Sequence, residues 1–229
     1  MQLTESLENL QRALGYRFND INYLQQALTH RSIGASNNER LEFLGDSVLN
    51  FCITQKLYDL LPDAAEGELS RIRASLVNKD ALAVIADTLE LANYLRLGRG
   101  EKQSGGRRRY SIQADAVEAV FGAILLDAGF DTVRTVINRL YQHQYDNLPD
   151  AETLKDPKTR LQEYLQSRGL GLPSYEVIRE TGRDHAKNFE VACSAADFPK
   201  ANATGSSRRK AEQAAAGSML EQIERSNAE

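Results

Sequence analysis

Three acidic residues in the segment NERLEFLGDS fall on one side of a predicted helix. At about 100° per residue, Glu42 lies about 60° from Glu39, and Asp46 falls between them. The stripe contains no Lys or Arg. The opposite side carries the apolar residues Leu41, Leu44, Val48, Phe51 and Cys52. Like charges on one stripe repel each other and do not help a chain to fold, whereas a divalent cation would relieve the repulsion. The stripe therefore predicts a metal site.

A second acidic pair lies in the segment IQADAVEAVFGAILLD, where Asp115 and Glu118 are three residues apart and so share a helix face. Small neighbours would let another helix approach closely; they are Ala114, Ala116 and Ala119. If the two acidic stripes face each other, they form a cage of oxygen ligands. Its members are Glu42, Asp46, Asp115 and Glu118. Such a cage suits Mg²⁺, a hard ion with a near-octahedral preference.

The chemistry that fits this cage is hydrolysis of a phosphodiester. A bound divalent cation activates water and stabilises charge on the transition state and on the leaving oxygen. A second metal is a common part of such sites, and Glu39 borders the cage where it would help to hold one. The alternative for any single acidic pair is a solvated helix face. Two such groups on helices otherwise built for burial favour the metal site.

Other polar residues in this half have two interpretations each. The basic segment GRRRY contains Arg107, Arg108 and Arg109, which either contact phosphate or form a solvated loop. Glu66 has the position of an ordinary acid in the first turn of a helix. His30 fits a hydrogen-bonded structural residue better than a general base.

The composition is that of an ordinary globular protein, with 229 residues, 41% hydrophobic and 26% charged, and a net charge of −4. Residues 1–154 carry 16 Lys and Arg against 21 Asp and Glu, and residues 155–229 carry 12 against 11. The acidic excess therefore belongs to the part with the predicted metal ligands, and net charge does not exclude a nucleic-acid partner.

Neither a leader nor a membrane segment is predicted. The N-terminal sequence lacks the pattern of a signal peptide, and the longest apolar stretch, residues 119–126, is too short to cross a bilayer. The two cysteines, Cys52 and Cys193, lack metal-ligand spacing. We therefore expect reduced thiols in a cytoplasmic protein that does not bind membranes.

The first two thirds of the chain are predicted to be helical. Apolar residues recur at three- and four-residue spacing from Leu7 to about Tyr145, with only short turns between the segments. The segment DNLPDAETLKDP, which follows, has the composition of a linker.

A different pattern follows the linker. Asp156 and Pro157 fit an N-cap and a first helical position. Alternating segments begin at Tyr175 and Phe189, and a weaker one lies at residues 200–204. An Ala-rich helix ends the chain. We therefore predict a mainly α protein that ends in a small α-β-β-β-α domain. The predicted divisions are a first domain over residues 1–148, a linker over 149–154 and a second domain over 155–226.

The last predicted helix begins with the cations Arg208, Arg209 and Lys210. The free N–H groups and the positive dipole end of a helix favour phosphate there. A solvated basic face is the alternative.

A polar stripe on the first helix of the small domain, made of Thr159, Gln162, Glu163 and Gln166, is able to contact 2′-hydroxyls and base edges in a shallow minor groove. His185, at the tip of the strand turn, is a third contact point or merely a turn residue. Three contact regions on one face match the way in which double-stranded RNA is bound, by its shape over about 16 base pairs.

Taken together, these motifs resemble those of the ribonuclease III family. NERLEFLGDS resembles the family signature, and ADAVEA resembles its second acidic motif. DPKTRLQEYLQ, HAKNF and TGSSRRKAEQAAA resemble the double-stranded RNA-binding domain that follows it. The resemblance covers nearly the whole chain, in the short bacterial form. It implies an all-helical endonuclease domain that forms a homodimer, in which each subunit cuts one strand of double-stranded RNA.

The resemblance also implies the products, the cofactor and the substrates. Cleavage would leave 5′-phosphate and 3′-hydroxyl ends with two-nucleotide 3′ overhangs. Mg²⁺ would be the cofactor, and Mn²⁺ would be able to replace it. Precursors of ribosomal RNA and structured mRNAs would be processed.

By residue match, the metal ligands would be Glu42, Asp46, Asp115 and Glu118, of which Asp46 and Glu118 act in catalysis. Glu39 and Glu66 match positions linked with cleavage or RNA contacts. Phe43 matches a residue that inserts into the partner subunit at the dimer interface.

In the second domain, the matched minor-groove residues are Thr159, Gln162, Glu163 and His185. The matched phosphate-binding residues are Arg208, Arg209 and Lys210. One departure is Glu212, where general domains of this kind often carry Lys. It implies weaker phosphate binding by this domain, so the dimeric nuclease domain would have to add affinity.

Two other functions fit parts of the chain. A noncatalytic protein that binds double-stranded RNA is disfavoured because all four candidate ligands are retained. A phosphohydrolase for small molecules is disfavoured by the second domain.

Overall fold

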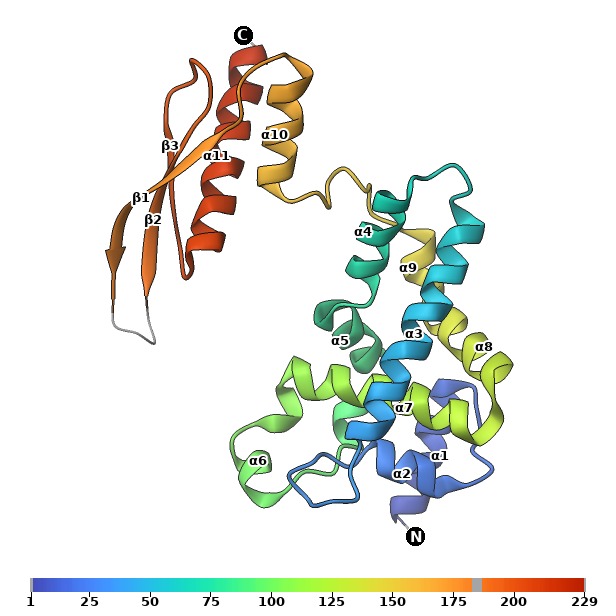
Figure 1. Cartoon of the computed structure of the whole chain (residues 1–229). Helices are drawn as coiled ribbons and strands as arrows, with labels where there is room; N and C mark the ends of the chain where they lie inside the picture. Colours follow the sequence, from blue (N-terminus) through green and yellow to red (C-terminus); the bar gives the residue numbers. More distant parts are fainter. Residues whose placement is uncertain (1, 183–186, 229) are drawn as a thin grey trace. The chain divides into compact units, whose positions relative to one another are not determined.

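A computed structural model describes residues 2–182 and 187–228. Contacts between residues divide the chain into two compact units, and the division in the sequence falls between Leu154 and Lys155. The first unit is built of helices, and the second contains a sheet and two helices (Figure 1). This mainly helical architecture with a terminal α-β-β-β-α unit confirms the predicted fold class.

The elements of the first unit are α1 (Gln2–Leu14), α2 (Ile21–Ala27), α3 (Glu39–Leu60), α4 (Glu66–Leu76), α5 (Lys79–Thr88), the 3₁₀ turn η1 (Leu91–Asn93), α6 (Arg99–Gln103), the 3₁₀ turn η2 (Gly106–Arg108), α7 (Tyr110–Ala128), α8 (Phe130–Leu140) and α9 (Gln142–Asp146). The longest two, α3 and α7, make the most extensive contact in the unit. They cross near its centre (Figure 1).

Helix α7 is buried along most of its length because its residues are almost all apolar or small. Phe121 is fully buried there, and Leu24 of α2, Ile53 of α3 and Ile137 of α8 belong to the same core. A helix that is apolar on nearly every side is buried, here in the core of the first unit. Its two acids, Asp115 and Glu118, are therefore drawn into partial burial by the helix that carries them.

The segment that was expected to be a linker, residues 149–154, lies against the first unit. Ala151 and Leu154 pack on the edge of the core, and the carbonyl of Ala151 accepts a hydrogen bond from Arg71 Nε at 3.2 Å. Its loop-like composition therefore marks irregular backbone that is anchored on the first unit.

The second unit contains α10 (Pro157–Ser167), β1 (Ser174–Thr181), β2 (Asn188–Ser194), β3 (Ala201–Gly205) and α11 (Arg208–Ala228). As expected, the Asp156 side chain caps α10 by accepting from the backbone N–H of Thr159, and Pro157 is the first helical residue. The strands form an antiparallel sheet in the order β1-β2-β3. Helix α11 packs on β2 and β3, and α10 packs on α11, around a separate core that includes Leu161, Val191 and Met219.

Within the described residues, none of the helices is long and apolar enough to cross a membrane.

Candidate active site

Two glycines bring α3 and α7 together at the site. A Cβ atom on Gly45 would lie 1.7 Å from the carbonyl oxygen of Glu118, and a Cβ on Gly122 would lie 2.2 Å from that of Leu41. Neither backbone could accept a larger residue without moving. Alanines were expected to allow the close approach; these glycines were not, although both lie in the quoted motifs, in LGDS and VFGA.

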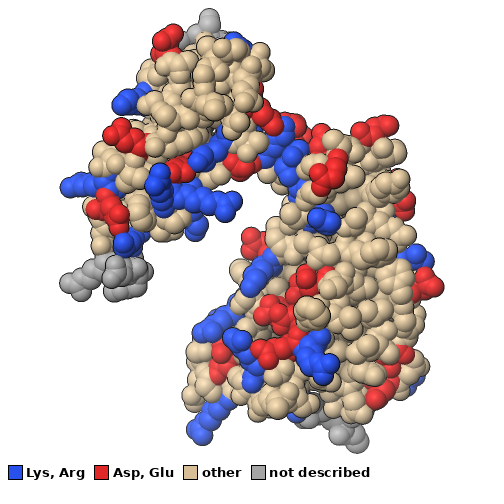
Figure 2. Space-filling model, viewed as in Figure 1, with Lys and Arg blue, Asp and Glu red and all other residues tan. Residues whose placement is uncertain are grey.

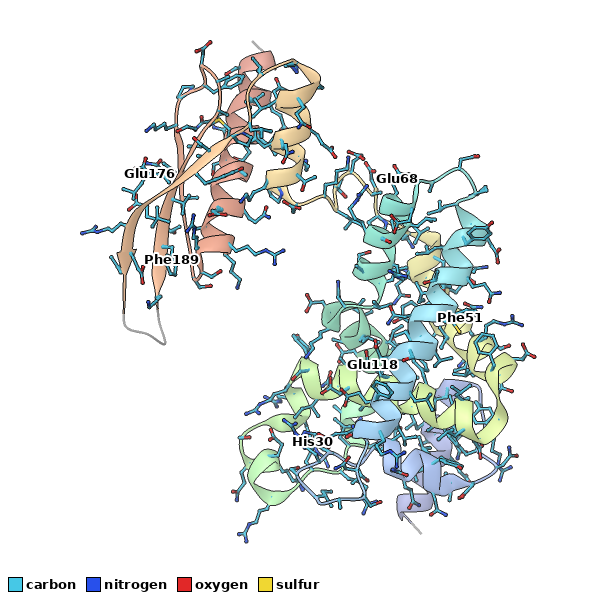
Figure 3. All side chains as sticks on the ribbon, viewed as in Figure 1. His30, Phe51, Glu68, Glu118, Glu176 and Phe189 are labelled. Carbon is cyan, nitrogen blue, oxygen red and sulfur yellow. The ribbon has the colours of Figure 1, made fainter. Side chains whose placement is uncertain are left out.

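The close crossing brings three carboxylates together. One oxygen of Glu42, from α3, and one each of Asp115 and Glu118, from α7, all lie within 4.8 Å of one another. All three residues are half-buried. Figure 3 shows Glu118 where α3 crosses α7. The structure thus joins three of the four predicted metal ligands.

The fourth predicted ligand, Asp46, lies on the wall of the same cavity. Its Oδ1 accepts a hydrogen bond from Asn50 Nδ2 at 2.8 Å, one helical turn further along α3. The side chain is exposed and is not part of the close group of three. Its charge still reaches that group, because Asp46 contributes to the electrostatic repulsion on Glu118.

Glu39 and Glu66, the two acids that match positions linked with cleavage or RNA contacts, lie apart in the structure. Glu39 lines the cavity, and its Oε1 lies 3.4 Å from Arg31 Nη1 in an exposed ion pair. Glu66 begins α4 and accepts a hydrogen bond from Ser70 Oγ at 2.8 Å. It is not among the residues that line the cavity.

The cavity has a volume of about 720 Å³, and cationic residues line it together with the acids. Lys79, Arg31 and Arg109 all line it. Figure 2 shows acidic side chains gathered on this face of the first unit, with Lys and Arg around them. Of the predicted basic run 107–109, Arg109 reaches the cavity and is paired with Glu101 at 2.8 Å. Sequence reasoning missed Lys79, whose only signal is its place at the start of α5 after the cap Asn78.

His30 also lines the cavity. Its ring is hydrogen-bonded, as the sequence indicated. Its Nδ1 lies 2.9 Å from Ser32 Oγ, which in turn accepts a hydrogen bond from the backbone N–H of Gly98 at 2.8 Å. These bonds hold the loop after α2 against the start of α6.

The cluster is electrostatically strained when it holds no cation. Burial, followed by repulsion from Asp46, Glu42 and Asp115, raises the pKa of Glu118 to about 8. Burial also raises the pKa of Glu42 and of Asp115. The Lys79 ammonium acts against all three shifts. A donor set made only of carboxylate oxygens suits a hard divalent cation, which would replace the proton and remove the repulsion.

In the second unit, the predicted contact residues on α10 are exposed on one face: Thr159, Gln162 and Glu163. Thr159 Oγ1 donates to Asp156 at 2.8 Å, and Glu163 pairs with Lys155 at 2.7 Å. The cations at the start of α11 are also exposed: Arg208, Arg209 and Lys210. His185 lies outside the described residues.

Comparison with known proteins agrees with this division of the chain. Residues 20–145 match the family described as Ribonuclease-III-like, and residues 157–223 match the double-stranded RNA binding motif. A Ribonuclease 3 of Alkalilimnicola ehrlichii is 55% identical over 216 residues, which cover 94% of this chain and 95% of that protein. This chain belongs to the ribonuclease III family.

Other members of the ribonuclease III family are similar over comparable lengths. A Ribonuclease 3 of Haemophilus influenzae is 50% identical over 222 residues, which cover 95% of this chain and 98% of that protein. A solved nuclease domain of ribonuclease III from Campylobacter jejuni superposes with a TM-score of 0.60 at 43% identity. It covers 61% of this chain and 99% of that domain. The carboxylate cluster lies inside the segment that matches the ribonuclease III family model.

Proposed function

We propose that this protein is an endoribonuclease that hydrolyses phosphodiester bonds of double-stranded RNA with the help of Mg²⁺. One observation carries the proposal. Three carboxylate oxygens meet within 4.8 Å in the ribonuclease III-like unit of a chain that also contains a double-stranded RNA binding motif. A cluster of carboxylates alone would fit many hydrolases, and the second unit indicates that the substrate is double-stranded RNA.

Glu42, Asp115 and Glu118 would hold the cation, with Asp46 completing the set from the cavity wall. The bound cation would supply an activated water and stabilise negative charge in the transition state. Of these four, Asp46 and Glu118 would be the residues that act in catalysis, as the family resemblance implies. Mn²⁺, which prefers similar oxygen ligands, would replace Mg²⁺.

The cations of the cavity attract the substrate. Lys79, Arg31 and Arg109 line the same cavity as the acids, where Arg31 is paired with Glu39 and Arg109 with Glu101. Without them, an acidic cavity would repel RNA. Their positive charge therefore draws a polyanion towards the acidic cluster.

We also propose that the first unit forms a homodimer. Phe43 is 77% exposed near the start of α3, next to Glu42. Beside it, an apolar surface hollow is lined by Leu44, Ser47, Val48, Phe51, Leu125 and Phe130. Exposed apolar surface of this kind is typical of protein interfaces. Two sites in one dimer would cut the two strands and leave 5′-phosphate and 3′-hydroxyl ends with two-nucleotide 3′ overhangs.

In the second unit, Thr159, Gln162 and Glu163 would contact the minor groove, and the cations that begin α11 would contact phosphate. Processing of ribosomal RNA precursors and structured mRNAs in the cytoplasm fits an enzyme that selects duplex shape. Glu66, remote from the cavity, fits a contact to RNA or product better than one to metal.

The proposal is tested by incubating the purified protein with a labelled RNA duplex and with a single strand of the same sequence. With Mg²⁺ or Mn²⁺, the duplex should be cut into fragments with 5′-phosphates, and the single strand should remain whole. EDTA should stop the reaction. A duplex that stays intact both with Mg²⁺ and with Mn²⁺ would overturn the proposed activity.

A further inference from the structure

The carboxylate of Glu212 lies between two cations in the second unit. Its Oε2 accepts a hydrogen bond from Lys158 Nζ at 2.7 Å, and its Oε1 accepts one from Arg208 Nε at 2.9 Å. Lys158 belongs to the first turn of α10, and Arg208 is the first residue of α11. These helices lie side by side (Figure 1). The carboxylate therefore joins the beginnings of both helices.

The two partners of Glu212 differ in their exposure to solvent and in their other contacts. The Lys158 side chain is 33% exposed, and its ammonium lies 4.3 Å from the centre of the Tyr175 ring in a cation–π contact. The Arg208 side chain is 66% exposed. Within the described residues, only its Nε has a hydrogen-bond partner. Arg208 is therefore the partner that another anion is able to remove.

The Glu212 side chain is held in place when Arg208 turns towards solvent. It is only 13% exposed, and both of its oxygens are engaged. The hydrogen bond from Lys158, with the further bond from Arg208, holds the pKa of Glu212 below its usual value, so the group stays charged in neutral solution. When a phosphate binds Arg208 in place of Glu212, the hydrogen bond between Lys158 and Glu212 remains. The negative charge of Glu212 then stays close to the bound phosphate.

The two cations that follow are not restrained in this way. Arg209 and Lys210 are exposed, and neither takes part in an ion pair within the described residues. Arg208 is thus the one member of the basic run whose charge is already compensated by a neighbour in the described structure.

We propose that Glu212 competes with the phosphates of RNA for Arg208 and so weakens the binding of nucleic acid by the second unit. This inference rests on the proposed function, because it assumes that the unit binds duplex RNA. A phosphate that binds Arg208 must replace a charge-assisted hydrogen bond and approach a carboxylate. The competition acts on any polyanion and leaves the choice of an A-form duplex to the minor-groove contacts of α10.

The test compares Glu212→Gln with Glu221→Gln in the full chain. Glu221 is a matched control, because it too pairs with an arginine one helical turn away on α11: its partner Arg225 follows it by four residues, at 3.7 Å, whereas Arg208 precedes Glu212 by four. Both variants remove one negative charge from the same helix. Binding of a 20-base-pair RNA duplex is measured over a series of KCl concentrations, with Ca²⁺ in place of Mg²⁺ to prevent cleavage.

We expect Glu212→Gln to bind the duplex about threefold more tightly at low salt, in line with the strength of exposed ion pairs. The salt dependence should steepen by up to about one unit of log–log slope. A DNA duplex of the same length should gain as much as the RNA duplex does. Arg208→Gln should remove most of the gain when it is combined with Glu212→Gln, and Glu221→Gln should change the affinity by less than about twofold.

A second measurement uses the unmodified protein and does not depend on the folding of a variant. The NMR signal of the Arg208 Nε–H group should shift when duplex RNA is added, because its partner changes from carboxylate to phosphate. An unshifted signal at saturation would overturn the inference, as would a folded Glu212→Gln variant that binds RNA equally or more weakly. In both cases the unmodified protein still binds duplex RNA, so the proposed function stands. An unmodified protein that fails to bind duplex RNA overturns both proposals.

Discussion

Gly45 of α3 lies directly against the main-chain carbonyl of Glu118 in α7, and a Cβ atom there would come within 1.7 Å of that oxygen. The same helices carry the acids of the cluster, Glu42 on one side and Asp115 and Glu118 on the other. The separation of the two backbones therefore decides whether the three carboxylates meet. A glycine with no chemical role of its own fixes the geometry of the site.

Gly45→Ala should separate α3 from α7 and damage both stability and metal binding. Because the clash is with backbone, we expect a loss of about 3 kcal/mol in the free energy of unfolding, at the upper end of overpacking. Urea denaturation and calorimetric titration with Mg²⁺ would measure the two effects.

Gly67→Ala is the matched control for that change. Gly67 is also helical, in α4, and a Cβ there would meet only the Arg71 Nη1 atom, at 3.4 Å. This variant should be stabilised by about 0.5–1 kcal/mol, since alanine favours a helix over glycine. Equal stability of both variants would contradict the account of the crossing.

The stability of the metal-free protein should fall as the pH rises from about 5 to about 8. The pKa of Glu118 is raised from 4.5 to about 8 in the folded chain, so in this range the folded chain binds more protons than the unfolded chain. Stability from such a group is present at low pH and is lost as the pH passes the folded value. Urea denaturation in EDTA across this range would show it.

Glu118→Gln removes the titrating group and supplies the control. In this variant, the loss of unfolding free energy between about pH 5 and about pH 8 should be smaller by about 1–2 kcal/mol. This amount allows for solvent screening at a half-buried site. Parallel pH profiles for the variant and the unmodified protein would show that Glu118 titrates at an ordinary pKa.

Phe51→Glu should convert the proposed homodimer into a monomer. Phe51 is 56% exposed and packs edge-on against Phe130, with 5.4 Å between ring centres, in the apolar hollow. A charge there would have to be buried against the partner subunit. Tyr58→Glu is the control, because Tyr58 is 72% exposed on the same helix and does not line the hollow. Light scattering should give a monomer for the first variant only; a dimer for both would place the interface elsewhere.

The sequence was sufficient to predict the helical first unit, the order of elements in the second and the two acidic groups. The three-and-four spacing of apolar residues indicated helices from Leu7 to about Tyr145 without their individual bounds, and alternation located strands at Tyr175 and Phe189. The pairs Glu42 with Asp46 and Asp115 with Glu118 could be recognised because local spacing determines which side chains share a helix face.

Side-chain rotamers and contacts between distant segments could not be predicted. The orientation of Asp46 towards Asn50 is a choice of rotamer, which spacing does not determine. Lys79 enters the cavity only because α5 begins beside it. Phe51 was placed on the apolar side of α3, but helix periodicity does not distinguish a surface covered by the same chain from one left open.

Separating RNA binding from cleavage at the carboxylate cluster tests the central claim most directly. Duplex RNA binding is measured with Ca²⁺ and cleavage with Mg²⁺ for Glu118→Gln and for Asp87→Asn, an exposed acid on α5 that does not line the cavity. We predict that both variants bind the duplex as the unmodified protein does, and that only Asp87→Asn cuts it. Normal cleavage by Glu118→Gln would contradict the assignment of the cluster as the active site.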